Sequence, residues 1–462
     1  MNPALRALNR FGLGARSGEA DALGEPRAWL MAQLDEPPPL LNDPSLPTAE
    51  DLSEAIRALR EAQRARDTEA LGRARVRVRE IAAAEAGASV TARLKSKGPF
   101  VERLVAFWSN HLCVSAAGKP LVAPLAGGYE RDVIRPHVLG RFEDMVLASA
   151  RHPAMLLYLD NAQSIGPNSA GGRMSARRGR GRGLNENYAR ELLELHTLGV
   201  DGGYTQEDVQ EAARVFTGWT VAGLSQGAPR QSGARRSRGA QESRDGFVFQ
   251  PALHELGSRT VLGVRYAEAG VGQGQALIRA LCSHPATGRF IAAKLVRHFV
   301  ADDSPPAAVA QVATAFLRSG GDLKEVARAV VGLSEAWDPQ HRKIRTPQDW
   351  LTAVLRAFDA REAPRGLSAI AGQLRHRLWA PPSPKGFGDT VREWADPDSL
   401  MNRAELARTI ARRVGRRVDP AGLVELIEVA AGDPLLALVA DESIAAPERV
   451  ALALAGPAFQ WR

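Results

Sequence analysis

The chain has 462 residues, of which 45% are hydrophobic, and a formal net charge of +8 that comes mostly from arginine. This length suits two or three ordinary domains or one large one, and the apolar fraction permits a sizeable core. No apolar run is long enough to span a bilayer, and the absence of a CxxC pair argues against a thiolate zinc site. A single disulfide between Cys113 and Cys282 stays open.

Residues 1–50 begin with a short predicted helix that carries the sequence NRFGLGAR. The Pro-rich stretch LDEPPPLLNDPSLP follows, and its proline density excludes regular helix and predicts an arm or linker. The first residues lack the apolar segment of a signal peptide. We therefore expect a cytoplasmic protein from the sequence as it stands, and a periplasmic or exported one if the true start lies upstream.

Residues 51–97 are charged and rich in alanine, which predicts a helical hairpin of one or two long exposed helices. Residues 98–305 hold most of the distinctive segments, and we expect a core helical domain there. Strand signal is scarce and is best in residues 245–266, where short β-branched and aromatic runs surround a turn. Helical patterns recur over residues 306–462, interrupted by a predicted loop with the sequence LWAPPSPKGFGDTVREW. The predicted fold class is mainly α: a large multi-helix domain with a small β-hairpin and long loops.

Two Arg-rich segments, Arg173–Gly183 and Ala228–Arg244, are predicted loops. Such loops can contact phosphate or an anionic surface, or they can be solvated insertions. Binding to nucleic acid is the least favoured function, because no recognised motif is present and no aromatic residues are interleaved with the basic runs.

The predicted helix from Asn185 to Leu198 raises the main functional question. On a helical wheel, Glu191 falls between two leucines and His196 falls between Leu192 and Ala189, so both should face the interior. A buried carboxylate is costly unless it is paired, hydrogen-bonded or bound to a metal. Either a buried hydrogen-bond network or a functional site would explain these residues. Their wheel positions are too far apart for direct ligation of one metal as in HExxH.

Other polar residues also fall on apolar faces or in predicted loops. His111 lies on the apolar arc of its helix. Asp208 matches a capping box with Thr205, yet its wheel position also allows it to point inward. Arg297 shares a face with Lys294 and His298 that could bind an anion, pair with inward carboxylates or be solvated. His254 lies with Glu255 in the predicted turn of the hairpin.

Together, several blocks resemble those of a bacterial family numbered 1800 among the domains of unknown function. They occur in order over nearly the whole chain: FWSNHLCVS, HPAMLLYLDNAQSIGPN, GLNENYARELLELHTLGVDGGYTQEDVQEAARVFTGW, HELGSRTVLG, LVRHFV, PPSPKGF and LALAGPAFQ. The resemblance implies a large, mostly helical bacterial protein, often exported and often encoded beside a sulfatase- or phosphatase-like partner, with no established reaction. This chain departs from the family in lacking an export signal and in having His254-Glu255 where His-Asp is more common.

One hypothesis is a metal- or carboxylate-dependent hydrolase that gathers these residues into an interior site. The predicted catalytic residues are Glu191, Asp208 and His196. The predicted substrate-binding residues are Asn161, Asn185, Asn187 and Arg297. A divalent metal, zinc or manganese by ligand type, would be held by His111, His254 and Glu191.

The alternative hypothesis is a non-catalytic envelope or assembly protein that binds a sulfatase-like partner protein. The buried polar residues would then form a packing network, and the Arg-rich loops would be a docking surface. An interior with no cleft at Glu191 would favour this second hypothesis.

Overall fold

The computed structural model describes residues 2–177, 183–222, 241–242, 246–414 and 418–462, and shows a mainly α-helical protein. Much of the two predicted Arg-rich loops lies outside these described residues. The part that is described includes Arg173, which belongs to a short helix rather than to a loop.

The N-terminal segment forms α1 (Pro3–Arg6), which continues directly into the π-helix η1 (Ala7–Phe11), and then α2 (Pro26–Asp35). The side chain of Asn2 caps α1 by accepting hydrogen bonds from the main chain of the first turn. The Pro-rich stretch that follows α2 has no regular helix, as the sequence predicts.

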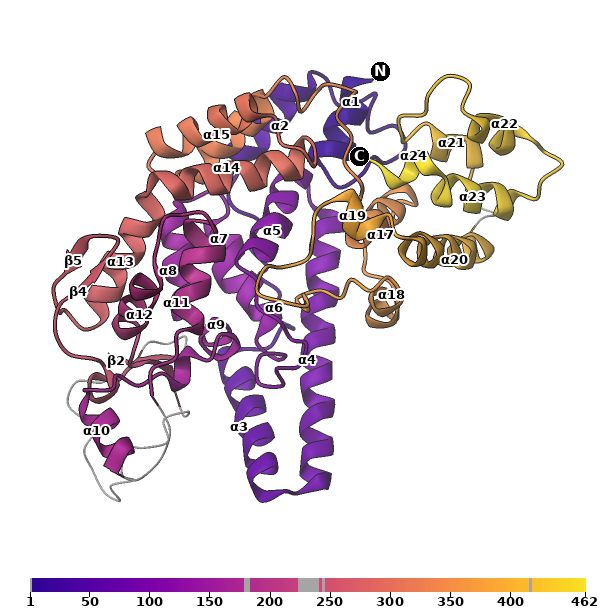
Figure 1. Ribbon diagram of the computed structural model, residues 1–462. Coiled ribbons are helices and arrows are strands. Elements are labelled where there is room, and N and C mark those ends of the chain that lie inside the picture. Colours follow the sequence, from indigo (N-terminus) through magenta and orange to yellow (C-terminus); the bar gives the residue numbers. More distant parts are fainter. Residues whose placement is uncertain (1, 178–182, 223–240, 243–245, 415–417) are drawn as a thin grey trace.

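The charged segment forms two antiparallel helices, α3 (Ala49–Ala65) and α4 (Thr68–Lys95), which project from the body of the molecule (Figure 1). Thr48 and Asp51 form a capping box at the start of α3. At the turn between the helices, Arg66 adopts a left-handed conformation with φ 53°. Leu59, Ala74 and Val78 pack together between the two helices, so the predicted hairpin is confirmed with a narrow apolar seam.

The central part of the chain is built from short helices that surround one apolar core. They are α5 (Pro99–His111), α6 (Ala126–Tyr129), η2 (Glu130–Ile134), α7 (Arg135–His137), α8 (Phe142–Arg151), α9 (Pro153–Tyr158), η3 (Asn161–Gln163), α10 (Ala170–Arg177), α11 (Asn187–Glu191), η4 (Leu192–Thr197) and α12 (Gln206–Val215). The predicted helix over 185–198 is therefore α11 followed by η4, and η4 is a π-helix.

Two small antiparallel sheets lie beside these helices. In the first, β1 (Trp219–Val221), β3 (Phe247–Phe249) and β2 (Gln241–Glu242) pair in the order β1-β3-β2. In the second, β4 (Arg259–Val261) and β5 (Val264–Tyr266) form a hairpin. Both of its turn residues, Leu262 and Gly263, have positive φ, as a tight two-residue hairpin requires.

The predicted hairpin is thus confirmed for β4 and β5, whereas β3 pairs with β1 instead. His254 does not lie in the turn of that hairpin. It follows the short 3-10 helix η5 (Pro251–Leu253), ahead of β4.

The remaining helices form the second half of the molecule. They are α13 (Val271–Ser283), α14 (Pro285–Phe299), α15 (Pro306–Arg318), α16 (Leu323–Gly332), α17 (Pro347–Ala357), α18 (Leu367–Gln373), α19 (Val391–Trp394), α20 (Pro397–Val414), α21 (Pro420–Val424), α22 (Pro434–Ala440), α23 (Ala446–Ala455) and α24 (Pro457–Gln460). The segment between α18 and α19 has no regular helix, as its proline and glycine content predicts.

The buried apolar side chains form two large clusters, which the N-terminal segment joins. Ala7 and Phe11 of η1 belong to a central cluster that includes side chains of α5 to α16. Leu5 and Leu8 belong to a second cluster, built mainly from α17 to α24 at the C-terminal end. In Figure 1 the N-terminal and C-terminal ends lie close together, between these two parts of the molecule.

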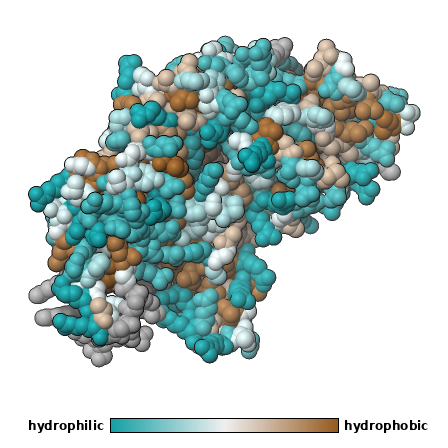
Figure 2. All heavy atoms as spheres, viewed as in Figure 1, coloured by the Kyte–Doolittle hydropathy of each residue, from teal (hydrophilic) through white to brown (hydrophobic). Residues whose placement is uncertain are grey.

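The surface is mainly hydrophilic on the face shown in Figure 2, with apolar patches that include the C-terminal end around α22. Leu436 and Leu438 of that helix are each 41% exposed. Among the helices that the structure describes, none has the length and apolar character needed to cross a bilayer.

Candidate functional site

The segment 381–389 lies against the end of α5 and brings two blocks of sequence together that are about 270 residues apart. Asn110 donates to the carbonyl of Phe387 at 2.9 Å and accepts from its N–H at 2.8 Å. Ser115 Oγ donates to the carbonyl of Pro381 at 2.7 Å. Gly386 has φ +86°, and a Cβ there would lie 2.5 Å from the carbonyl oxygen of Asn110. Glycine is therefore required for this close approach.

His111, at the end of α5, is held between two other elements. Its Nε2 lies 3.1 Å from the carbonyl oxygen of His196 in η4, and its Nδ1 lies 2.9 Å from Lys294 Nζ in α14. These partners assign the Nε2–H tautomer, with Nδ1 accepting from the ammonium group. Burial, and then the charge of Lys294, lower the pKa of His111 well below its usual value. The ring is therefore neutral and linked at both nitrogens.

Lys294 and His196 complete this cluster. Burial lowers the pKa of Lys294 to about 8, while the charge of Asp389 favours its charged form. Its Nζ lies 5.6 Å from the centre of the Phe290 ring, a cation–π contact. Burial lowers the pKa of His196 to about 3, and its Nε2 has no hydrogen-bond partner among the described residues. The prediction that His196 faces inward is confirmed, since its exposed fraction is 2%.

Glu191 lies at the end of α11 and is half-buried rather than fully interior. Burial and the neighbouring Glu194 raise its pKa, and Arg190 partly offsets them. Its carboxylate makes no hydrogen bond or ion pair with any residue that the structure describes. The Glu191 charge also contributes to raising the pKa of Cys113 to about 12, where burial is the main cause. Glu191 is thus a carboxylate without a direct partner among those residues, near a thiol that stays protonated.

Asp208 has a local role at the start of α12. One oxygen accepts from the N–H and the hydroxyl of Thr205, both at 2.8 Å, and the other accepts from the N–H of Leu262 at 2.6 Å. Burial would raise the pKa of this carboxyl, but the hydrogen bonds from Leu262 and Thr205 lower it. The predicted capping box is confirmed, and Asp208 also fastens the β4–β5 hairpin to α12.

His254 belongs to a separate place in the fold. Its Nδ1 lies 2.9 Å from the carbonyl oxygen of Thr217, and its ring packs edge-to-face on Phe249. The neighbouring Glu255 accepts from the N–H of Asn168 at 2.8 Å and from its side-chain amide at 2.6 Å. Both residues therefore hold loops in place.

The three asparagines predicted to orient substrate are bonded to the main chain. Asn161 donates to the carbonyls of Phe216 and Trp219, each at 3.1 Å. Asn187 donates to the carbonyl of Leu159 at 3.3 Å, and Asn185 accepts from the N–H of Asn187 at 2.9 Å. These contacts fix the entry of α11. Arg297 is exposed on α14.

A second polar pair lies on α14, one turn beyond Lys294, and its carboxylate belongs to a residue that sequence reasoning missed. His298 Nδ1 lies 2.7 Å from Asp389 Oδ2. Burial lowers the pKa of His298 to about 4, although Asp389 favours its charged form. Two cations also lie near Asp389 Oδ1: Lys343 Nζ at 3.8 Å and Arg462 Nη2 at 3.9 Å. Helical spacing placed Lys294 and His298 on one face of the helix, with inward carboxylates among the possible partners, but nothing in the sequence pointed to Asp389 as their neighbour.

A second missed feature is a buried ion cluster around Glu130 of η2. Arg93 and Arg135 approach its carboxylate at 3.1 and 3.2 Å, and Trp379 Nε1 donates to it at 3.0 Å. Arg135 also pairs with Glu102 at 2.9 Å. Burial alone would raise the pKa of Glu130, but the two arginines hold it at about 2. This cluster joins α4, α5, η2 and the segment after α18.

With this geometry in place, comparison with known proteins identifies the family. A family model described as "Protein of unknown function (DUF1800)" matches residues 6–461. The chain belongs to the DUF1800 family. No curated protein and no solved structure matches it. The family description assigns no reaction, so the function of this DUF1800 protein is argued from its own residues.

The predicted metal set is not assembled in this DUF1800 protein. His111 is bonded to His196 and Lys294, and His254 is bonded to Thr217, so the two rings share no partner. Within the described ranges there is no group of three or more His, Cys, Asp or Glu side chains placed to hold a metal ion. The disulfide that the sequence left open is not formed, since Cys113 and Cys282 are both free and buried.

Proposed function

We propose that this DUF1800 protein is a non-catalytic assembly protein whose interior polar residues serve packing. The observation that carries the proposal is that the predicted site residues are bonded into separate local networks. The predicted metal ligand His111 is tied to Lys294 and to the carbonyl of the predicted catalytic residue His196. The predicted catalytic residue Asp208 is tied to Thr205 and Leu262, and the predicted metal ligand His254 is tied to Thr217.

The chemistry of these groups supports the same proposal. A general base needs a free lone pair at the reacting atom. The carboxylate oxygens of Asp208 accept hydrogen bonds from main-chain N–H groups, and both ring nitrogens of His111 are engaged. Buried polar groups satisfied in this way fix the relative positions of helices, which is a structural role.

The partner expected from the family resemblance is a sulfatase-like protein encoded beside this one. Co-expression of the two chains followed by size-exclusion chromatography tests the assembly role. We expect a stoichiometric complex that persists when Glu191 is changed to Gln, since Glu191 is not needed for packing. If the two chains elute separately at concentrations of about 10 μM, the proposed assembly role is wrong.

Glu191 favours a second candidate function, an acid–base enzyme. A half-buried carboxylate with a raised pKa and no direct partner among the described residues is the kind of group that can act as a general acid or base. Elemental analysis of protein purified without chelator would distinguish the two candidates. Stoichiometric zinc or manganese that is lost in Glu191→Gln would favour the hydrolase.

A further inference from the structure

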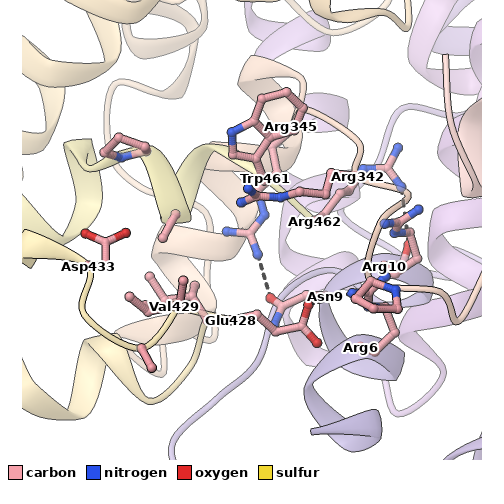
Figure 3. A pocket seen from close by; sticks show the side chains of 16 residues that line it. Arg6, Asn9, Arg10, Arg342, Arg345, Glu428, Val429, Asp433, Trp461 and Arg462 are labelled. Carbon is pink, nitrogen blue, oxygen red and sulfur yellow. Dashed lines mark hydrogen bonds and ion pairs between the residues drawn. The ribbon is translucent and has the colours of Figure 1, made fainter. Parts of the chain in front are cut away.

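A pocket of about 460 Å³ lies between the N-terminal segment and the C-terminal end of the chain (Figure 3). Its walls come from α1 and η1, from residues 339–345, from the loop after α21 and from residues 457–462. The volume is within the range of pockets that hold small organic molecules. The pocket is separate from the Glu191 region, because none of the predicted site residues lines it.

The side chains that line this pocket carry an excess of positive charge. Five are arginines: Arg6, Arg10, Arg342, Arg345 and Arg462. Two are carboxylates: Glu428 and Asp433. Figure 3 shows the arginines gathered in the centre and right of the view, with Asp433 at the left. Glu428 pairs with Arg6 at 2.8 Å, and Arg462 pairs with Asp349, behind the pocket lining, at 3.5 Å. Arg10, Arg342 and Arg345 have no carboxylate within ion-pair distance among the described residues, so the pocket keeps an excess of positive charge.

Two of the arginines are fixed in position by bonds to the main chain. Arg10 donates to the carbonyls of Phe299 and Val300, at 3.0 and 2.6 Å, at the C-terminal end of α14. A cation there is favoured by the helix dipole. Arg345 donates to the carbonyl of Phe459 at 3.1 Å and to Asn9 Oδ1 at 2.5 Å. The positive wall is therefore preorganised rather than mobile.

This arrangement is costly without a counter-ion. Arg10 and Arg345 have exposed fractions of 0% and 2%. Burial, and then nearby guanidinium groups that include Arg103, lower the pKa of Arg345 to about 9. Burial, followed by Arg6 and Arg462, lowers the pKa of Arg10. The Nε atoms of Arg10 and Arg462 have no hydrogen-bond partner among the described residues. Like charges held together in this way are relieved by a bound anion.

The other side of the pocket is apolar. Ile427, Val429 and Ala458 line it, together with the ring of Trp461. The guanidinium carbon of Arg342, which is exposed, lies 5.2 Å from the centre of that ring. A flat or aliphatic group could pack on this wall while its charged group faces the arginines.

We propose that this pocket binds a small organic anion that carries a phosphate or carboxylate group with two or more negative charges. The exposed guanidinium group of Arg342 can pair with either oxyanion in bidentate geometry, and the positive charge of the buried arginines favours multivalent anions over chloride. This inference is independent of the assembly role, because it uses none of the same residues.

The test is isothermal titration calorimetry with inorganic phosphate and with citrate, at constant ionic strength balanced with sodium chloride. We expect saturable binding of at least one of the two anions at concentrations up to about 10 mM. Binding of phosphate alone or of citrate alone would assign the pocket to phosphates or to carboxylates. If neither anion binds saturably, the proposal is overturned.

Three variants make the test specific to the pocket. Arg342→Ala removes an exposed cation and should weaken the affinity about 3- to 10-fold. Glu428→Gln removes the carboxylate that pairs with Arg6 and should tighten binding about 3-fold or more. Asp433→Asn should act in the same direction. It keeps the cap on α22, where Asp433 accepts from the N–H of Leu435 at 2.9 Å.

Arg79→Ala on the exposed surface of α4 is the matched control and should leave the dissociation constant unchanged. Unchanged affinity in Arg342→Ala, Glu428→Gln and Asp433→Asn alike would place the anion elsewhere and overturn the proposal.

Discussion

Glu191 shows how a single residue departs from the pattern of its helix. It belongs to a leucine-rich segment, yet its carboxylate is half-buried and makes no direct bond to a described residue. Its raised pKa means that the folded state disfavours the ionised form. An acid whose pKa rises on folding lowers stability above that pKa and has no such effect below its unfolded value. Glu191 therefore reduces stability at neutral pH.

Glu191→Gln should accordingly be at least as stable as the wild type at pH 7, with a gain on the order of 0.5 kcal/mol. The difference should shrink as the pH falls and disappear near pH 3, well below the unfolded glutamate pKa of about 4.3, where the carboxyl is protonated in both states. Urea unfolding followed by circular dichroism at the two pH values measures it. Glu405→Gln, on the exposed face of α20, is the control and should be neutral at both. A loss of more than about 1 kcal/mol in Glu191→Gln would show that this carboxylate has a stabilising partner.

At the scale of elements, the molecule depends on contacts between segments far apart in the sequence. The segment 381–389 is fastened to the end of α5 by Asn110 and Ser115. This segment also supplies Asp389, which pairs with His298 of α14. The irregular segment 381–389 thus contacts both α5 and α14 of the central apolar cluster. In the sequence it lies between α18 and α19, in the part of the chain that builds the C-terminal cluster.

Gly386→Ala should destabilise the protein by more than about 1 kcal/mol. Alanine is strained at a positive φ, and its Cβ would clash with the carbonyl of Asn110. Gly432→Ala is the matched control. Gly432 has a similar φ of +82° but no atom within 4 Å of the added Cβ, so alanine there causes only the backbone strain of a positive φ. The difference in urea midpoint between the two variants measures the clash. Equal losses would mean that the 381–389 segment moves away from α5 without cost.

The elements that the sequence predicted correctly are those decided by local signals. The charged, Ala-rich helical pattern predicted the α3–α4 hairpin, and the capping motif predicted the capping box of Thr205 and Asp208. The wheel for residues 185–198 assumed one regular helix, whereas the π-helix η4 changes the angle per residue after Glu191. His196 was nevertheless placed correctly inside, and Glu191 only in part. The pairs His111–Lys294 and His298–Asp389 depend on tertiary packing, which no local pattern contains.

At the scale of the whole molecule, buried charges link its two apolar clusters. Asp349 at the start of α17 pairs with Arg103 of α5 at 3.2 Å and with Arg462 at 3.5 Å. Burial would raise the pKa of Asp349, but these arginines lower it strongly. Buried ion pairs add little net stability when intact, but they are costly to break because the remaining charge stays desolvated. They therefore make the arrangement of the two clusters specific.

Buried histidines give the molecule a further dependence on pH. Burial lowers the pKa of His196 and His376 to about 3 and that of His298 to about 4. In the unfolded chain a histidine titrates near pH 6.5. A group whose pKa falls on folding stabilises the fold above its unfolded value, and this contribution is lost as the pH drops toward the folded value. Stability should therefore fall between about pH 6.5 and 5. Glu85, whose pKa burial raises to about 7, and Glu191, whose pKa burial also raises, act in the opposite direction and partly offset this fall.

His376→Phe should reduce this acid sensitivity while keeping the packing, because the His376 ring stacks on Trp394 at 4.8 Å. Fully developed, one histidine contributes about 1.4 kcal/mol per pH unit to the slope of the unfolding free energy. Urea unfolding at several pH values from about 8 to 5 measures the slopes. The wild type and His376→Phe should run parallel above about pH 7 and diverge below it, with the variant losing less. Parallel curves down to pH 5 would mean that the His376 ring takes up its proton over the same pH range in the folded and in the unfolded protein, so that its position beside Trp394 accommodates a cation.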